Sequence, residues 1–97
     1  MASKHKPNRN AARASYARSR SAPVHPGEVL RQDFLEPMGI TAYRLAKETG
    51  MTALHIGRII KGTRGISGDA ALRFARYFGT SAQVWIGLQA QYDLDVA

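Results

Sequence analysis

The sequence predicts an all-α fold, a bundle of five helices preceded by a basic N-terminal tail. Apolar residues recur at helical spacing in successive segments, glycines separate these segments, and no long stretch alternates polar and apolar residues. The chain has 97 residues, of which 44% are hydrophobic, and this suits one small domain. We therefore divide it into a tail, residues 1–23, and a folded domain, residues 24–97.

The tail differs from the domain in charge. The net charge is +7, and residues 1–22 hold six of the fourteen Lys and Arg residues and no acid. Such a segment buries too little apolar surface to offset its ordering entropy, so we expect it to be disordered when free. Three roles are open: a solubilising tail or the product of an upstream start site, an arm that follows phosphates or folds on a partner, and an organellar transit peptide.

Composition argues against several classes of protein. Without cysteine, neither a disulfide nor a thiolate zinc site can form. His5, His25 and His55 match no metal-ligand spacing, so we predict neither a metal nor a cofactor. No apolar run approaches the ~20 residues of a membrane span. The acids are scattered, and we find no nucleophile beside a base and no glycine-rich phosphate loop, so we do not expect an enzyme.

The first helix is predicted to begin at residues 25–28 (HPGE). Pro26 fits a first helical turn, and Glu28 is favourable near the positive end of the helix dipole. Pro37 and Gly39 are expected to end the helix. Its apolar stripe consists of Val29, Leu30, Phe34 and Leu35.

The second and third helices are short and joined by a tight turn within residues 40–60 (ITAYRLAKETGMTALHIGRII). Ala46, Gly50 and Ile56 follow one another at offsets of four and six residues. A small residue lets two helices approach, a glycine allows a left-handed turn, and an aliphatic side chain fixes the second helix from behind. Thr41 and Thr52 are the expected caps. This spacing predicts a helix-turn-helix unit, whose second helix can enter the major groove of DNA.

Two further helices complete the predicted domain. Ser67 is expected to cap the fourth after a loop at residues 62–65 (GTRG), with Ile66 linking that loop to the core. Gly79 is expected to end the fourth helix, and Thr80 with Gln83 to form a capping box for the fifth. The apolar stripe of the fourth helix, at i, i+3, i+4 and i+7, is Ala71, Phe74, Ala75 and Phe78.

The fifth helix carries more apolar surface than one small bundle needs. Trp85 and Leu88 are candidates for the core, whereas Ile86, Tyr92 and Leu94 are available for a contact with a second copy. A single helix-turn-helix covers only a few base pairs, and a two-fold dimer reads two half-sites. We therefore predict a homodimer through this helix.

The candidate DNA contacts lie at the starts of the second and third helices and in the loop after them. Hydroxyls and free N–H groups at helix starts can bind phosphates, and an arginine can reach a guanine edge with two hydrogen bonds. The predicted DNA-facing residues are Thr41, Thr52, Ala53, Leu54, His55 and Arg58, and the predicted backbone contacts are Tyr43, Arg44, Lys61, Thr63 and Arg64.

Three residues of the third helix have more than one interpretation. Leu54, which can only pack on thymine methyls or sugars, is otherwise a surface apolar residue. His55 is either an auxiliary donor in the groove or a solvated side chain. Gly57 costs roughly 1 kcal/mol against alanine in mid-helix, and it allows close approach either of DNA or of a neighbouring helix.

Several motifs resemble the HigA-type antitoxins, which are XRE-like helix-turn-helix proteins of the HigA/VapI family. Residues 25–30 (HPGEVL) and 34–39 (FLEPMG) resemble the opening of these proteins, and residues 62–67 (GTRGIS) resemble their loop after the recognition helix. Their end is similar to residues 71–73 (ALR), 77–80 (YFGT), 85–89 (WIGLQ) and 91–94 (QYDL). The resemblance covers about residues 23–95.

This resemblance implies a phage-repressor-like fold and a homodimer that binds an operator in its own promoter. It also implies neutralisation of a HigB-like toxin, which in that family is a RelE-like mRNA endonuclease, and hence a cytoplasmic, nucleoid-associated bacterial protein. Family members often carry polar residues where Ala53 and Leu54 stand, and the basic tail is atypical. Because such toxins are usually basic, we expect the tail to serve DNA, so deleting residues 1–22 should lower the slope of log K against log salt by up to ~5.

We therefore predict an antitoxin that represses its own transcription. The alternatives are a stand-alone repressor of the same fold without a toxin, and an interaction module whose helix-turn-helix has lost DNA binding. An upstream reading frame for a small basic protein favours the antitoxin. Binding that does not distinguish the protein's own promoter from random DNA favours the interaction module.

Overall fold

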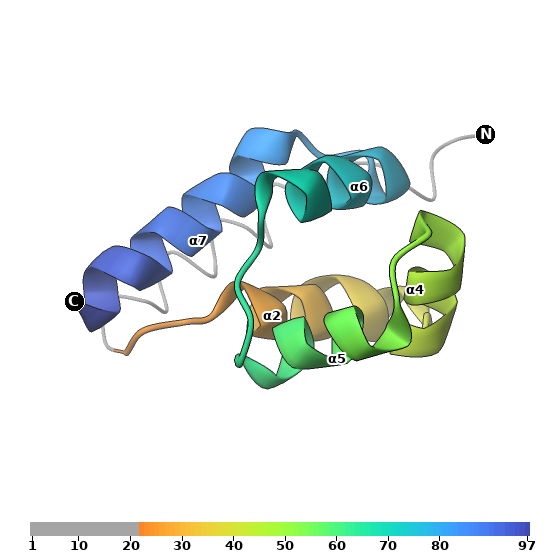
Figure 1. The fold of residues 1–97 in the computed structure, drawn as a ribbon, viewed down its shortest axis with the longest axis horizontal. Helices are drawn as coiled ribbons and strands as arrows, with labels where there is room; N and C mark the ends of the chain where they lie inside the picture. Colours follow the sequence, from red (N-terminus) through yellow and green to blue (C-terminus); the bar gives the residue numbers. More distant parts are fainter. Residues whose placement is uncertain (1–21) are drawn as a thin grey trace.

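The structure, a computed structural model, describes residues 22–97, and the regular elements of that range are helices joined by short loops (Figure 1). The predicted tail, residues 1–23, lies outside the described residues except for positions 22 and 23. The five predicted helices are confirmed. The first is one continuous segment in three parts, and the bounds are α2 (Pro26–Val29), η2 (Leu30–Leu35), α3 (Glu36–Met38), α4 (Ala42–Thr49), α5 (Ala53–Lys61), α6 (Gly68–Phe78) and α7 (Ala82–Val96).

Pro37 does not end the first helix, and this prediction is wrong. It stands in the first turn of α3, directly after the π-helical residues of η2. Proline lacks an N–H and crowds the carbonyl four residues before it, and the wider π turn relieves that conflict. The N–H of Glu36 donates to the carbonyl of Arg31, five residues back. Gly39, with a φ of 65°, ends the segment as predicted.

Hydroxyl side chains cap the helices that follow. The Thr41, Thr52 and Ser67 oxygens accept the third amide of α4, α5 and α6 at 3.0, 3.0 and 3.1 Å, which confirms these predicted caps. The predicted capping box at Thr80 is wrong. Ser81 caps α7 instead, because the Thr80 hydroxyl accepts a hydrogen bond of 2.9 Å from the indole N–H of Trp85. A buried indole needs a partner more than an exposed helix start does.

The helices form two layers around one core. Figure 1 shows α6 and α7 on one side and α2, α4 and α5 on the other, with the loop after α5 crossing between the layers. The predicted apolar stripes meet in the middle, where Phe34, Phe74, Phe78 and Trp85 pack with ring centroids 4.9–6.3 Å apart. Leu88 and Ile66 join this core, as predicted.

Two features are absent from residues 22–97. No helix in this range is both long enough and apolar enough to cross a bilayer. The same residues contain no group of three or more His, Asp or Glu side chains suited to holding a metal ion.

Candidate nucleic-acid interface

The helix α5 has a buried back and an open front. On the back, Ile56 and Ile59 have no exposed surface. The first turn of α2 approaches so closely there that a Cβ atom added at Gly27 would lie 1.7 Å from the carbonyl oxygen of Ile59. On the front, Arg58 is exposed and Leu54 retains 64% of its exposure. The third predicted helix is therefore held from behind and faces solvent in front.

The turn between α4 and α5 has the geometry that the sequence spacing predicts. Ala46 is buried where the two helices meet, and Ile56 is buried behind α5. Gly50 has a φ of 76°, a left-handed conformation that glycine adopts at little cost. The N–H of Met51 donates to the Ala46 carbonyl at 3.0 Å and completes the turn. The helix-turn-helix prediction is confirmed.

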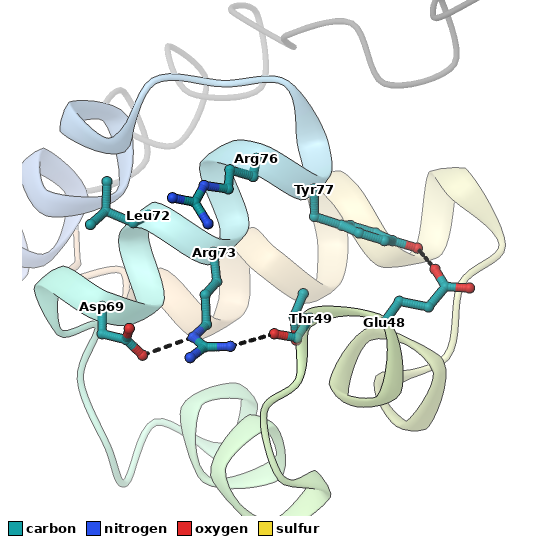
Figure 2. Close-up of a pocket in the computed structure, with 7 residues that line it drawn as sticks. All are labelled: Glu48, Thr49, Asp69, Leu72, Arg73, Arg76 and Tyr77. Carbon is teal, nitrogen blue, oxygen red and sulfur yellow. Dashed lines mark hydrogen bonds and ion pairs between the residues drawn. The ribbon is translucent and has the colours of Figure 1, made fainter.

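A cleft of about 370 Å³ lies between the end of α4 and α6 (Figure 2). Arg73 reaches across it from α6, donating through Nη1 to the Thr49 carbonyl at 2.6 Å and through Nε to Asp69 at 2.9 Å. The Tyr77 hydroxyl donates to Glu48. These bonds hold the turn against α6. Sequence reasoning missed this function of Arg73, because the spacing from Asp69 signals only a pair within one helix.

The starts of α4 and α5 present free hydrogen-bond donors. In each helix the threonine cap accepts the third amide, and the two amides before it have no partner within residues 22–97. These are the amides of Ala42 and Tyr43 in α4, and of Ala53 and Leu54 in α5. The hydroxyls of Thr41 and Thr52 act as acceptors in the caps, so each still has a proton to donate. Tyr43 is 68% exposed beside these groups.

Positive charge without an acidic partner collects at the other end of α5. Arg58, Lys61 and Arg64 are exposed, and within residues 22–97 none of them forms a salt bridge. Arg44 differs, because its Nε atom donates to Glu48 at 3.0 Å and this bond raises the pKa of the guanidinium. The Nη atoms of Arg44 are not used in that bond. Uncompensated cations are suited to phosphate groups, and here they lie at the opposite end of α5 from the free amides.

His55 is less exposed to solvent than it would be either as a donor in the DNA groove or as a solvated side chain. It is half-buried, and its Nε2 atom has neither access to solvent nor a hydrogen-bond partner within the described range. Burial lowers the pKa of His55, the charge of Arg64 lowers it further, and Asp69 acts in the opposite direction. The ring is therefore not simply solvated, and base contact through Nε2 requires the side chain to turn.

Gly57 has no neighbour that explains it. A Cβ atom added there would find nothing within 4 Å. No other helix within residues 22–97 therefore comes close enough to be the reason for this glycine. The other interpretation of the sequence, a close approach of DNA, remains a prediction.

The loop after α5 is tied back to that helix. The amides of Thr63 and Arg64 both donate to the Arg58 carbonyl, at 3.0 and 3.2 Å, and the Thr63 hydroxyl donates to the same oxygen at 3.2 Å. The predicted backbone contacts Lys61, Thr63 and Arg64 therefore lie together at the end of α5. This arrangement brings them beside Arg58, away from the threonine caps at the helix starts.

The structure leaves two of the predicted dimer residues exposed and half-buries the third. Ile86 and Leu94 are 42% and 72% exposed, and with Ala90 they follow an i, i+4, i+8 line on α7. Tyr92 is half-buried and has a partner in its own chain, because its ring packs edge-to-face on His25 with centroids 4.8 Å apart.

Comparison with known proteins agrees with this geometry. The helix-turn-helix family model matches residues 32–85. Virulence-associated protein I of Dichelobacter nodosus is 47% identical over 74 residues, which are 76% of this chain and 68% of the relative. Antitoxin HigA-1 of Vibrio cholerae is 32% identical over 77 residues, 79% of this chain and 72% of that protein. A solved structure of Pseudomonas aeruginosa antitoxin HigA with the higBA promoter matches at 44% identity and a TM-score of 0.75, covering 76% of this chain and 80% of that one.

Proposed function

Because the chain belongs to the helix-turn-helix family, with relatives named antitoxin HigA and virulence-associated protein I, we propose that it is an antitoxin that binds and represses its own promoter. The observation that carries the proposal is the open front of α5. Within residues 22–97, the start of α5 has free amides, its end has cations without a salt bridge, and Gly57 between them has open space where a Cβ atom would stand. The related Pseudomonas antitoxin was solved with promoter DNA.

In this proposal α5 enters the major groove with its N-terminal end against the bases. Ala53 and Leu54 contact thymine methyl groups or sugars, and Arg58 donates two hydrogen bonds to a guanine. The free amides of α4 and α5 bind phosphates on either side, aided by Thr41, Thr52, Tyr43 and Arg44.

The backbone grip at the other end of α5 comes from Lys61, Thr63 and Arg64. His55 contributes only after its side chain turns. Few side chains offer hydrogen bonds to bases, so phosphate contacts provide much of the affinity and the binding depends steeply on salt.

We further propose that two copies pair through α7. Ile86, Ala90 and Leu94 form an apolar line that the monomer leaves exposed, whereas Tyr92 is half-buried and packs on His25 instead. Leu94→Glu places a charge in that line and should give a monomer by sedimentation, with unchanged helical circular dichroism. A variant that remains dimeric would locate the interface elsewhere.

Arg58→Ala tests the DNA proposal. Affinity for the protein's own promoter should fall by about 1–3 kcal/mol, and preference at one base position should relax. Arg76→Ala is the matched control, because Arg76 is also an exposed cation without a salt bridge in the described range, and it lies on α6. Fluorescence anisotropy with promoter and scrambled duplexes separates the outcomes.

Equal loss on both duplexes would make Arg58 a phosphate contact rather than a base-reading residue. If the wild-type chain binds promoter and scrambled duplexes alike, the repressor proposal fails and the interaction module is favoured.

The toxin proposal needs a separate experiment. The reading frame beside this gene should be expressed alone and then together with the full chain. We expect growth arrest in the first case, recovery in the second, and a stable complex on co-purification. Normal growth in the first case, or no recovery in the second, would leave a stand-alone repressor.

A further inference from the structure

A glutamine of α7 holds the loop that follows α5. The Oε1 atom of Gln89 accepts the amide of Ile66 at 2.7 Å, across 23 positions of sequence. Its Nε2 atom donates to Asp93 at 2.9 Å. Because one end of the amide is an acceptor and the other a donor, these two bonds together select a single orientation of the group. The side chain of Gln89 is thus fixed on the loop.

Gly65 lies against the same side-chain amide of Gln89. A Cβ atom at this position would lie 2.9 Å from Oε1, 3.0 Å from Cδ and 3.1 Å from Nε2 of Gln89. Gly65 is not among the glycines with a positive φ, so its backbone conformation is open to other residues. The approach of the Gln89 amide therefore explains this glycine, and any side chain here displaces that amide.

The loop is consequently anchored at both ends. Its first half is bound to α5, where the amides of Thr63 and Arg64 donate to the Arg58 carbonyl. Its second half is bound to α7 through Ile66, whose side chain is also buried in the core. Arg64, exposed and without a salt bridge in residues 22–97, belongs to the first anchor through its amide and lies two positions before the second.

We propose that Gln89 is a positioning residue for DNA binding, which holds the loop so that Thr63 and Arg64 face the phosphates beside the groove. This inference rests on the proposed function. Gln89 itself contacts no DNA, and it lies on the helix whose exposed line we assign to the dimer. The hydrogen bond from Ile66 to Gln89 therefore joins the dimer helix to the phosphate-binding loop of the same chain.

Gln89→Ala in the full chain should weaken binding to the promoter duplex by about three- to tenfold, the value of one neutral hydrogen bond. The salt slope should fall by up to about 1 for each phosphate contact that is lost. Gln91→Ala is the matched control. Gln91 makes the same kind of i, i+4 bond to Asp95, at 2.8 Å, and no hydrogen bond to the loop, so we expect less than a twofold change.

A double-mutant cycle with Gly65→Ala isolates the contact. Gly65→Ala alone should weaken binding to a similar extent, because the added methyl group displaces the Gln89 amide. In the Gln89→Ala background the same change should have less than a twofold effect. Amide hydrogen exchange at Ile66 should quicken in both single variants by more than exchange at the core amides does, which distinguishes the broken bond from a general loss of stability.

The inference is overturned if Gln89→Ala binds within twofold of wild type, if Gln91→Ala loses as much, or if the effects of Gly65→Ala and Gln89→Ala simply add. Every affinity is measured at a temperature at which circular dichroism shows that variant folded. The wild-type comparison of promoter and scrambled duplexes is made first. Its failure defeats the proposed function, whereas a selective wild type with an unaffected Gln89→Ala defeats only the positioning function.

Discussion

Gly27 of α2 packs on the back of α5, Gly57 lies on its front, and the two glycines differ in the space around them. At Gly27 an added Cβ atom would lie 1.7 Å from a carbonyl oxygen of α5, so the backbones of α2 and α5 leave no room for a side chain. At Gly57 the same atom would find nothing within 4 Å. The glycine on the back is required by the fold, whereas the glycine on the front weakens the helix and makes room for no other part of residues 22–97.

This difference separates structure from function along one helix. Ile56 and Ile59 on the back contribute to the core, and their burial stabilises the domain. Leu54 and Arg58 on the front contribute little to folding, because solvent surrounds them. Gly57 weakens the helix, yet within residues 22–97 it has open space where a side chain would stand, and this fits the proposed approach of DNA.

The largest expected effect is a loss of stability at the back of α5, where α2 packs against it. Gly27→Ala should destabilise the domain by about 3 kcal/mol or more, because the clash is with backbone atoms that cannot rotate away. Urea denaturation followed by circular dichroism measures it. A change below about 0.5 kcal/mol, the range of ordinary surface substitutions, would mean that α2 and α5 are not packed this closely.

The front should respond in the opposite direction. Gly57→Ala should stabilise the helix by about 0.5–1 kcal/mol, yet weaken promoter binding by about tenfold or more, equivalent to 1.4 kcal/mol, because the methyl group meets the DNA. Thermal unfolding and anisotropy measure the two effects.

Gly68→Ala is the matched control for the front. A Cβ atom added at Gly68 would also find nothing within 4 Å, and this residue begins α6 outside the predicted DNA contacts. Its substitution should leave promoter affinity unchanged. If Gly57→Ala binds DNA as tightly as wild type, the open front of α5 is not in close contact with the duplex.

Sequence reasoning succeeded where the information is local. Helical spacing identified Trp85 and Phe74 as core residues, and the offsets of Ala46 and Gly50 located the turn. It failed where a distant partner decides the outcome. Thr80 is a good cap by type, but the indole of Trp85 takes its hydroxyl.

The candidate site, like the fold, was predictable from the sequence only where local residues determine the structure. The exposed position of Arg58 follows from the helical register of Ile56 and Ile59 behind it. The bonds of Arg73 to Thr49 and of Gln89 to Ile66 span 24 and 23 positions, so no local pattern encodes them. Likewise, the sequence does not show whether Gly27 or Gly57 has room for a side chain, since only the packed fold does.

The smallest expected effect is a dependence of the domain's stability on pH, and it arises at the start of α2, which packs behind α5. His25 caps α2 by accepting the Gly27 amide at Nδ1, at 2.9 Å, and its ring lies against Tyr92. Burial lowers the pKa of His25 below its ordinary value of 6.5, and Asp93 and Glu28 offset part of that shift. The unfolded chain therefore takes up the proton more readily than the folded one. Stability is full above pH 6.5 and declines as the pH falls through the lowered pKa.

His25→Asn separates this effect from that of His55, whose pKa is also lowered. Asparagine can cap the helix with its side-chain oxygen and does not titrate in this range. Urea midpoints at pH 7.5 and pH 5 should therefore differ less in His25→Asn than in wild type. An equal loss in both proteins would assign the pH dependence to other groups.

The open front of α5 is tested most directly by amide hydrogen exchange of the full chain, resolved by residue, with and without its promoter duplex. We expect DNA to slow exchange at the free amides of Ala53 and Leu54 and in the loop at Arg64 and Gly65, with no change on the outer face of α6 around Leu72 and Arg76. Slowed exchange confined to α6 or α7, with α5 unaffected, would contradict the account.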